Sequence, residues 1–232
     1  MNRAALQLIA MHGWAGDSRA WGPWQEAAGR RGWGWQSGER GYGQLAPSSP
    51  QWPQHSGPRA VIVHSLGLHL LPETVLAGAE AVVLLASFGR FVPAGPGGRR
   101  WRQALRGMGQ RLEAGDTAAM LNDFLREAAA PAAVERLPAG PASASMPAEG
   151  IERLRQDLRR LEQCSAVPAA YPTGARSLIV EAGADRIVAA ESRSALAQAL
   201  PAAERWPLAG AGHSLLECDL IEPMLDWLEA GL

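Results

Sequence analysis

Three polar residues in this chain, a serine, an aspartate and a histidine, are of the types that carry out nucleophilic catalysis together. Ser65 stands in Val-Ile-Val-His-Ser-Leu-Gly, a pattern typical of a strand that turns sharply into a helix. Such a turn exposes the serine, and the N-terminus of the following helix favours negative charge that develops nearby. Asp185 and His213 follow later apolar runs. With a carboxylate and an imidazole close by, a serine hydroxyl can attack a carbonyl carbon.

Each of these residues also has a simpler interpretation. A serine before a helix is commonly its N-cap, Asp185 suits a turn, and His213 suits a glycine-rich loop. The dipeptide His12-Gly13, which ends another apolar run, could be a simple turn. All four features nevertheless fall at the carboxyl ends of expected strands, where open α/β sheets place their sites. The chain order Ser, Asp, His also occurs in serine hydrolases, and the combination argues against chance placement.

The elements that must position these residues alternate between apolar runs and helical patterns. This alternation predicts an α/β fold, with a mostly parallel sheet and helices on both of its faces. The expected strands are Leu6–Met11, Arg59–His64, Glu80–Phe88, Ser177–Glu181 and Arg205–Leu208. The expected helices are Trp21–Arg30, Leu66–Ala77, Glu191–Leu200 and Leu216–Ala230.

The pattern changes between the third and fourth expected strands. Residues 90–174 contain no strand candidate but have helical patterns near 99–113, 116–130 and 149–163. We therefore expect a core formed by residues 1–89 and 175–232, with residues 90–174 inserted as a helical lid over the sheet.

Composition excludes several classes of protein. The 22 basic residues, all arginine, are balanced by 23 acidic ones, so we expect no generic nucleic-acid binding. No apolar stretch approaches the roughly 20 residues that a membrane span needs. The apolar start of the chain runs into His12-Gly13 without a small-residue cleavage site, which argues against a signal peptide. Cys164 and Cys218 are most simply two reduced thiols, so we expect a soluble cytoplasmic protein.

In these residues and in the motifs around them, the chain resembles the α/β-hydrolase-fold esterases. Within that fold it is most similar to the pimeloyl-[acyl-carrier protein] methyl ester esterases of biotin synthesis. The resemblance runs nearly end to end. Its motifs are His12-Gly13-Trp14 with Trp21, Glu39-Arg40-Gly41-Tyr42-Gly43, His64-Ser65-Leu66-Gly67, Asp157-Leu158-Arg159, Gly183-Ala184-Asp185-Arg186-Ile187-Val188 and Gly212-His213.

The resemblance implies a serine carboxylesterase that needs no metal and no cofactor. Ser65 would attack the ester, His213 would take its proton, and Asp185 would orient the imidazole. The backbone N–H groups of Trp14 and Leu66 would form the oxyanion hole, and the Trp14 side chain would line the acyl pocket.

Four further residues have structural interpretations or depart from the family's pattern. We expect His64 and His69 to pack rather than to catalyse, because one triad already supplies a base. Val63 stands where the family usually has glycine, and Leu68 follows Gly67 in place of a second glycine. Larger side chains at these positions predict a looser or locally adjusted turn at the serine.

A run of arginines in the expected lid suggests a partner. Residues 90–160 have a net charge of +4, and on a helix Arg99, Arg102 and Arg106 would share one face. One interpretation is a solvated lid surface in an arginine-rich protein. The other is a binding surface for an acyl carrier protein that bears the pimeloyl methyl ester, because arginine binds phosphate bidentately. We expect the enzyme itself to be a monomer.

Three functions compete at this stage. The first is hydrolysis of the methyl ester of a carrier-bound pimeloyl chain. The second keeps the fold and the triad but acts on small free esters or thioesters. The third is a catalytically inactive hydrolase fold that serves as a binding module, which the complete set Ser65, Asp185 and His213 disfavours.

Overall fold

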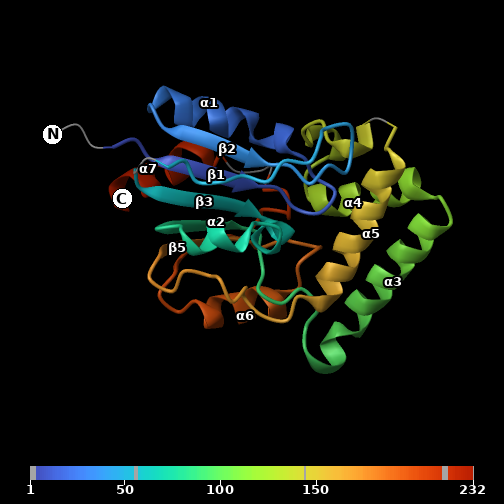
Figure 1. Cartoon of the computed structure of the whole chain (residues 1–232). Coiled ribbons are helices and arrows are strands. Elements are labelled where there is room, and N and C mark those ends of the chain that lie inside the picture. Colours follow the sequence, from blue (N-terminus) through green and yellow to red (C-terminus); the bar gives the residue numbers. More distant parts are fainter. Residues whose placement is uncertain (1–3, 55–56, 144, 216–218, 232) are drawn as a thin grey trace.

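The centre of the protein is a sheet of six parallel strands, seen in a computed structural model that describes residues 4–54, 57–143, 145–215 and 219–231 (Figure 1). The strands lie side by side in the order β2-β1-β3-β4-β5-β6. Their bounds are β1 Gln7–Met11, β2 Gly34–Gly38, β3 Arg59–His64, β4 Ala81–Leu85, β5 Arg176–Ala182 and β6 Glu204–Leu208. The predicted parallel α/β sheet is confirmed.

Helices cover both faces of the sheet, because successive residues of each buried strand point to opposite faces. Leu8 and Ala10 of β1 pack on the side of α1 Gly22–Arg30 and α7 Ile221–Gly231. Ile9 and Met11 pack on the other side, with the short helix η2 Ser65–His69, α2 Glu73–Ala77 and α6 Ala190–Ala199. This arrangement explains why β1, β3 and β4 appear in the sequence as continuous apolar runs.

Residues 90–174 form a helical segment at the carboxyl end of the sheet (Figure 1). Its main helices are α3 Arg99–Glu113, α4 Thr117–Ala129 and α5 Ala148–Gln163, within a residue of the patterns seen in the sequence. It also contains three short 3-10 helices, η3 Gly95–Gly98, η4 Val134–Arg136 and η5 Pro141–Ser143, and no strand among its described residues. The segment has a core of its own, which includes Leu112, Met120 and Leu154 and reaches Trp14 and Leu66 beneath it.

Three sequence predictions about elements were wrong. β2 was not predicted, because Gly-Trp-Gln-Ser-Gly has no apolar run and forms a half-exposed strand at the sheet edge. The continuous helix predicted for Leu66–Ala77 is instead η2 followed by α2, since Pro72 has no N–H group with which to continue a helix and precedes α2 as its N-cap. The last helix begins at Ile221 rather than Leu216, and residues 216–218 lie outside the described ranges.

The strand order places a crevice at one point of the sheet edge. β1 pairs with β2 on one side and with β3 on the other, so the chain changes direction across the sheet between β1 and β3. Ligands of open α/β sheets bind outside the carboxyl ends of the strands at such a switch. His12 follows β1 and Ser65 follows β3, so the fold brings both to this crevice. No helix in the described ranges is long and apolar enough to cross a membrane.

Candidate active site

Ser65 occupies a strained turn between β3 and η2. Its φ angle is 55°, in the left-handed region that side chains other than glycine rarely adopt. The turn also requires glycine two residues later, because a Cβ atom on Gly67 would lie 2.4 Å from the carbonyl oxygen of Met11. Strain of this kind persists only where the surrounding structure holds it, and it is typical of functional sites.

The structure brings the three predicted catalytic residues together in one hydrogen-bonded row. Nε2 of His213 lies 3.0 Å from Oγ of Ser65, and Nδ1 of His213 lies 2.8 Å from Oδ2 of Asp185. The other carboxylate oxygen of Asp185 accepts hydrogen bonds from the N–H groups of Ile187, at 2.7 Å, and Val188, at 2.9 Å. The loops after β3, β5 and β6 supply the three side chains.

The electrostatics of Asp185 favour a carboxylate. Burial of its side chain, which is 0% exposed, works against ionisation. His213 and the two N–H donors outweigh burial and hold the pKa of Asp185 below its usual value. An ionised Asp185 accepts a hydrogen bond from the N–H at Nδ1 of His213, which leaves the lone pair of Nε2 directed at Ser65.

His64, next to the nucleophile in sequence, supports the backbone of the catalytic loop. Its Nε2 lies 2.9 Å from the carbonyl oxygen of His213, to which it donates, and the two rings are 5.0 Å apart. Burial and the neighbouring His213 lower the pKa of His64 to about 4. His64 is therefore neutral near pH 7 and packs beside the row of catalytic groups.

The loop after β1 passes directly over Ser65. A Cβ atom on Gly13 would lie 2.9 Å from Cβ of Ser65, so only glycine permits this close approach. Leu66 is the second residue of η2, where an N–H group has no acceptor within its own helix. Within the described ranges, the Trp14 N–H donates to no backbone oxygen. The residues predicted to supply the oxyanion hole thus adjoin Ser65 in different ways: Leu66 follows it in the chain, and Trp14 follows the glycine that passes over it.

A cavity of about 640 Å³ lies beside Ser65 and His213. Trp14, whose indole N–H donates to the carbonyl oxygen of Leu154 at 2.9 Å, forms part of its wall. Most of the other lining side chains are apolar, among them Trp21, Trp24, Leu125, Val134, Leu137 and Ile221. The acidic residues along the described lining are Asp17, Glu135 and Asp219, and the lining has no arginine.

His69 and Cys164, whose side chains could also react, have structural roles. Nε2 of His69 lies 3.0 Å from the carbonyl oxygen of Phe88, whose ring stacks on the imidazole, and burial lowers the pKa of His69. Burial raises the pKa of the Cys164 thiol to about 12, so it has no nucleophilic thiolate near pH 7. Cys218 lies outside the described residues. In the part of the chain that the structure describes, no group of three His, Cys, Asp or Glu residues could hold a metal ion.

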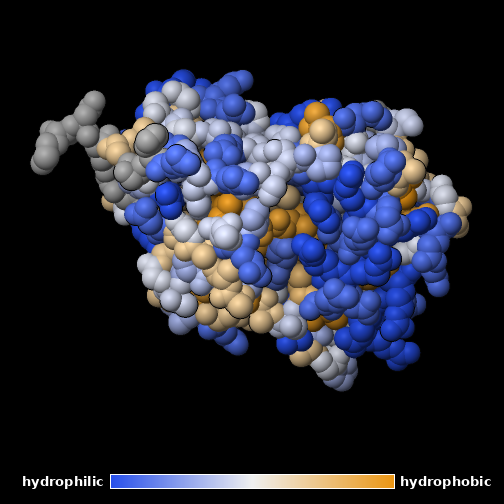
Figure 2. Space-filling model, viewed as in Figure 1, coloured by the Kyte–Doolittle hydropathy of each residue, from blue (hydrophilic) through white to orange (hydrophobic). Residues whose placement is uncertain are grey.

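The predicted arginine surface lies on α3, away from Ser65. Arg99, Arg102 and Arg106 line a hollow of about 320 Å³ on the helix together with Gln103. In the view of Figure 1, hydrophilic residues cover most of the surface around α3 and α5 (Figure 2). Arg111, near the end of the same helix, is paired with Asp116 and Asp123, each at 2.7 Å.

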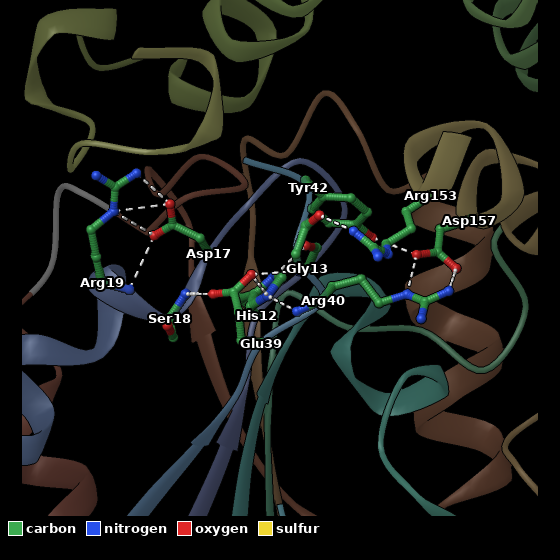
Figure 3. A network of polar contacts seen from close by, with 11 residues as sticks. His12, Gly13, Asp17, Ser18, Arg19, Glu39, Arg40, Tyr42, Arg153 and Asp157 are labelled. Atoms are coloured by element: carbon green, nitrogen blue, oxygen red, sulfur yellow. Dashed lines mark hydrogen bonds and ion pairs between the residues drawn. The ribbon is translucent and has the colours of Figure 1, made fainter. Parts of the chain in front are cut away.

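Sequence reasoning missed a buried polar network beside the site (Figure 3). Arg40 forms two hydrogen bonds with Asp157, of 2.6 and 3.0 Å, and the hydroxyl of Tyr42 donates to the same carboxylate at 2.7 Å. The sequence signal was present in the motifs Glu39-Arg40-Gly41-Tyr42-Gly43 and Asp157-Leu158-Arg159. Because 117 residues separate Arg40 from Asp157, no local pattern could show that they meet.

Comparison with known proteins shows the fold. No protein-family model matches the chain, and no curated protein matches its sequence. Solved structures do match. The enol-lactonase from Burkholderia xenovorans is 15% identical with a TM-score of 0.68, over 97% of this chain and 92% of that one. An E-2-(acetamidomethylene)succinate hydrolase is 18% identical with a TM-score of 0.64, over 98% and 92%. An esterase from Exiguobacterium antarcticum is 9% identical with a TM-score of 0.66, over 99% and 93%. The chain therefore has the α/β-hydrolase fold.

Proposed function

We propose that this protein is a serine carboxylesterase. The observation that carries the proposal is the hydrogen-bonded row of Ser65, His213 and Asp185 in the wall of a 640 Å³ cavity. A strained serine, a histidine within hydrogen-bond reach of it and a buried carboxylate in this order are the parts that acyl transfer requires.

The reaction would proceed in two halves. Oγ of Ser65 attacks the ester carbonyl carbon while Nε2 of His213 takes its proton, and the resulting oxyanion accepts hydrogen bonds from the N–H groups of Trp14 and Leu66. The alcohol then leaves with the proton from His213, and the acyl group stays on Ser65. Water attacks this acyl-enzyme in the same way and releases the carboxylic acid and free Ser65.

We further propose that the substrate is the methyl ester of a pimeloyl chain carried by an acyl carrier protein, as in biotin synthesis. The largely apolar cavity suits an aliphatic chain. Its charged lining residues in the described ranges are acids, which disfavour a free carboxylate at the far end of the chain. An acyl chain that ends in a methyl ester and a thioester is uncharged and meets this condition.

The arginine surface on α3 supports the carrier part of the proposal. Arg99, Arg102 and Arg106 line one hollow on the outer helix α3. Arginines placed in this way can bind the acidic surface of a carrier protein or the phosphate of its pantetheine arm.

Two measurements test the proposal. A fluorophosphonate probe should label the protein on Ser65, identified by mass spectrometry of the labelled peptide, and label found on Ser87 or Ser214 would refute the assignment. The kcat/KM for the carrier-linked methyl ester should then exceed the kcat/KM for the same pimeloyl methyl ester joined as a thioester to a small thiol. Equal kcat/KM for the two would refute carrier recognition and leave the esterase.

The second candidate is a general hydrolase of small free esters or thioesters. The same row of residues supports it, and so does the cavity, whose largely apolar lining can accept many small esters. The comparison of carrier-linked and free substrates separates it from the first candidate. A binding module without catalysis would show no turnover of any ester and no labelling of Ser65.

A further inference from the structure

We propose that helix α5 positions the oxyanion-binding peptide between Gly13 and Trp14 through a buried polar chain that starts at Asp157. The chain runs from Asp157 through Arg40 and His12 to the carbonyl group of Gly13 (Figure 3). This proposal rests on the proposed function, because it takes the Trp14 N–H as a donor to the oxyanion.

The first link is a clamp between α5 and residues 39–42. The carboxylate of Asp157, 1% exposed, accepts two hydrogen bonds from the guanidinium of Arg40 and one from the hydroxyl of Tyr42. Tyr42 is completely buried. A buried carboxylate held bidentately by arginine has one favourable geometry and is costly to leave unpaired, so α5 and Arg40 keep a fixed relation.

The second link runs from this loop to His12. The backbone N–H of Arg40 donates to Nε2 of His12 at 3.1 Å. The loop itself is held by Glu39, whose carboxylate accepts from the N–H groups of Gly41, at 2.7 Å, and Ser18, at 2.8 Å. Since Nε2 of His12 is an acceptor, the proton of the neutral ring resides on Nδ1.

The third link aims the oxyanion donor. Nδ1 of His12 lies 2.8 Å from the carbonyl oxygen of Gly13 and donates to it. That carbonyl and the N–H of Trp14 belong to one planar trans peptide and point in opposite directions. A hydrogen bond that fixes the carbonyl therefore also fixes the direction of the Trp14 N–H beside Ser65. The indole of Trp14 is bonded to Leu154 of α5, so this helix holds the peptide from both sides.

The arrangement makes Asp157, Arg40 and His12 positioning residues that touch no reacting atom. Oxyanion donors act on the charge that forms in the transition state, so loss of their alignment should reduce kcat and spare KM. A general loss of stability also lowers the apparent kcat at unchanged KM, but kcat per folded molecule then stays at the wild-type value.

The test compares three variants of the full chain in hydrolysis of p-nitrophenyl butyrate. Asp157→Asn should lower kcat about tenfold with KM within about twofold, less than the loss of a whole oxyanion donor. It should weaken binding of a trifluoromethyl ketone, which forms a transition-state-like adduct, by a similar factor. Tyr42→Phe, which removes one hydroxyl, gives the same pattern at smaller size and serves if Asp157→Asn does not fold. Met224→Ala, which truncates a buried side chain of α7, is the stability control and should preserve kcat in its folded fraction.

Two substitutions of His12 separate its two hydrogen bonds. The side-chain amide of asparagine places a donor near the position of Nδ1, whereas the longer glutamine places its polar end near the position of Nε2. His12→Asn should therefore keep more kcat than His12→Gln. Equal kcat in these two variants, or an Asp157→Asn effect on KM alone or no larger than that of Met224→Ala, would overturn the proposal.

Failure of the proposed function would be seen separately. If wild type and Ser65→Ala hydrolyse the ester equally, the esterase assignment fails whatever the other variants do. Hydrogen exchange of the backbone amides at residues 11–16 then decides whether α5 holds the peptide. Faster exchange in Asp157→Asn than in Met224→Ala supports the link, and equal exchange refutes it.

Discussion

The sheet edge and the outer surface of α3 both carry clusters of polar residues, but the two differ in how their groups are paired. At the sheet edge, the side chains of Ser65, Asp185 and His213 are buried, and each bonds to a partner that the fold brings from a different loop. On α3, Arg99 and Arg106 are exposed in a hollow lined by other long polar side chains. One cluster is defined by geometry and the other by charge.

This difference determines how strongly each cluster supports a function. Buried polar groups must find partners, so the arrangement at the sheet edge has few alternatives and indicates a specific reaction. Exposed arginines are solvated and can serve many partners or none. Two other arginines of α3 have partners within the protein: Arg100 stacks at 3.9 Å over the ring of Trp101, and Arg111 is ion-paired.

The largest effect should come from removal of the nucleophile. Ser65→Ala should reduce kcat for p-nitrophenyl butyrate by about 10⁶-fold, the order of loss known for serine hydrolases without their serine. Far-ultraviolet circular dichroism should remain unchanged, because alanine relieves rather than adds crowding at the turn. Wild-type turnover in this variant would show that the residues at the sheet edge indicate a function no better than the arginines on α3 do.

Asp185→Asn tests the buried carboxylate and should cost about 10⁴-fold in kcat. The amide nitrogen of asparagine would donate to Nδ1 of His213, which moves the ring proton to Nε2. In that tautomer His213 cannot accept the proton of Ser65. Addition of Ser65→Ala to this variant should cost far less than the product of the two single losses, because the residues act as one unit. Additive losses would contradict the shared mechanism.

The same contrast explains which parts could be predicted from the sequence. Apolar runs gave β1, β3, β4 and β5, and helical periodicity gave α3, α4 and α5, because burial against neighbours on both faces or on one stripe leaves a local pattern. β2 left no such pattern, since half of its surface is exposed. Pro72 was visible in the sequence, but the apolar residues around it led to the prediction of one continuous helix.

Within the site, the residues at strand ends could be predicted because topology alone brings those ends together. The clamp between Arg40 and Asp157 could not, because it depends on how α5 packs on a loop far away in sequence. The neutral state of His64 was equally hidden, since it arises from burial beside His213 and not from neighbours in the chain.

His64 links the buried cluster to stability. Its pKa is about 4 in the folded protein and near 6.5 when unfolded, so between these values the unfolded state binds one more proton. Stability is therefore fully present above about pH 6.5 and falls as pH decreases toward 4. Urea unfolding should show a loss of about 2 kcal/mol between pH 7.5 and pH 5 from this group. The free energy of unfolding of His64→Gln, which lacks the titrating ring, should fall by about 2 kcal/mol less over this range. An equal loss in both proteins would contradict the assignment.

The smallest effect is expected from the α3 surface, and it should depend on the substrate. Reversal of charge in R99E/R102E/R106E should raise KM for a carrier-linked ester about tenfold at low salt, because rim charges act mainly on encounter. The difference from wild type should shrink as ionic strength rises past about 0.1 M, where exposed charges are screened within roughly 10 Å. Hydrolysis of p-nitrophenyl butyrate should change less than twofold, since α3 does not line the cavity.

The control R30E/R205E reverses two exposed arginines on α1 and β6 and should leave KM for both substrates unchanged. Equal losses on both substrates would make the α3 cluster a structural feature, and the carrier-protein proposal would lose its independent support.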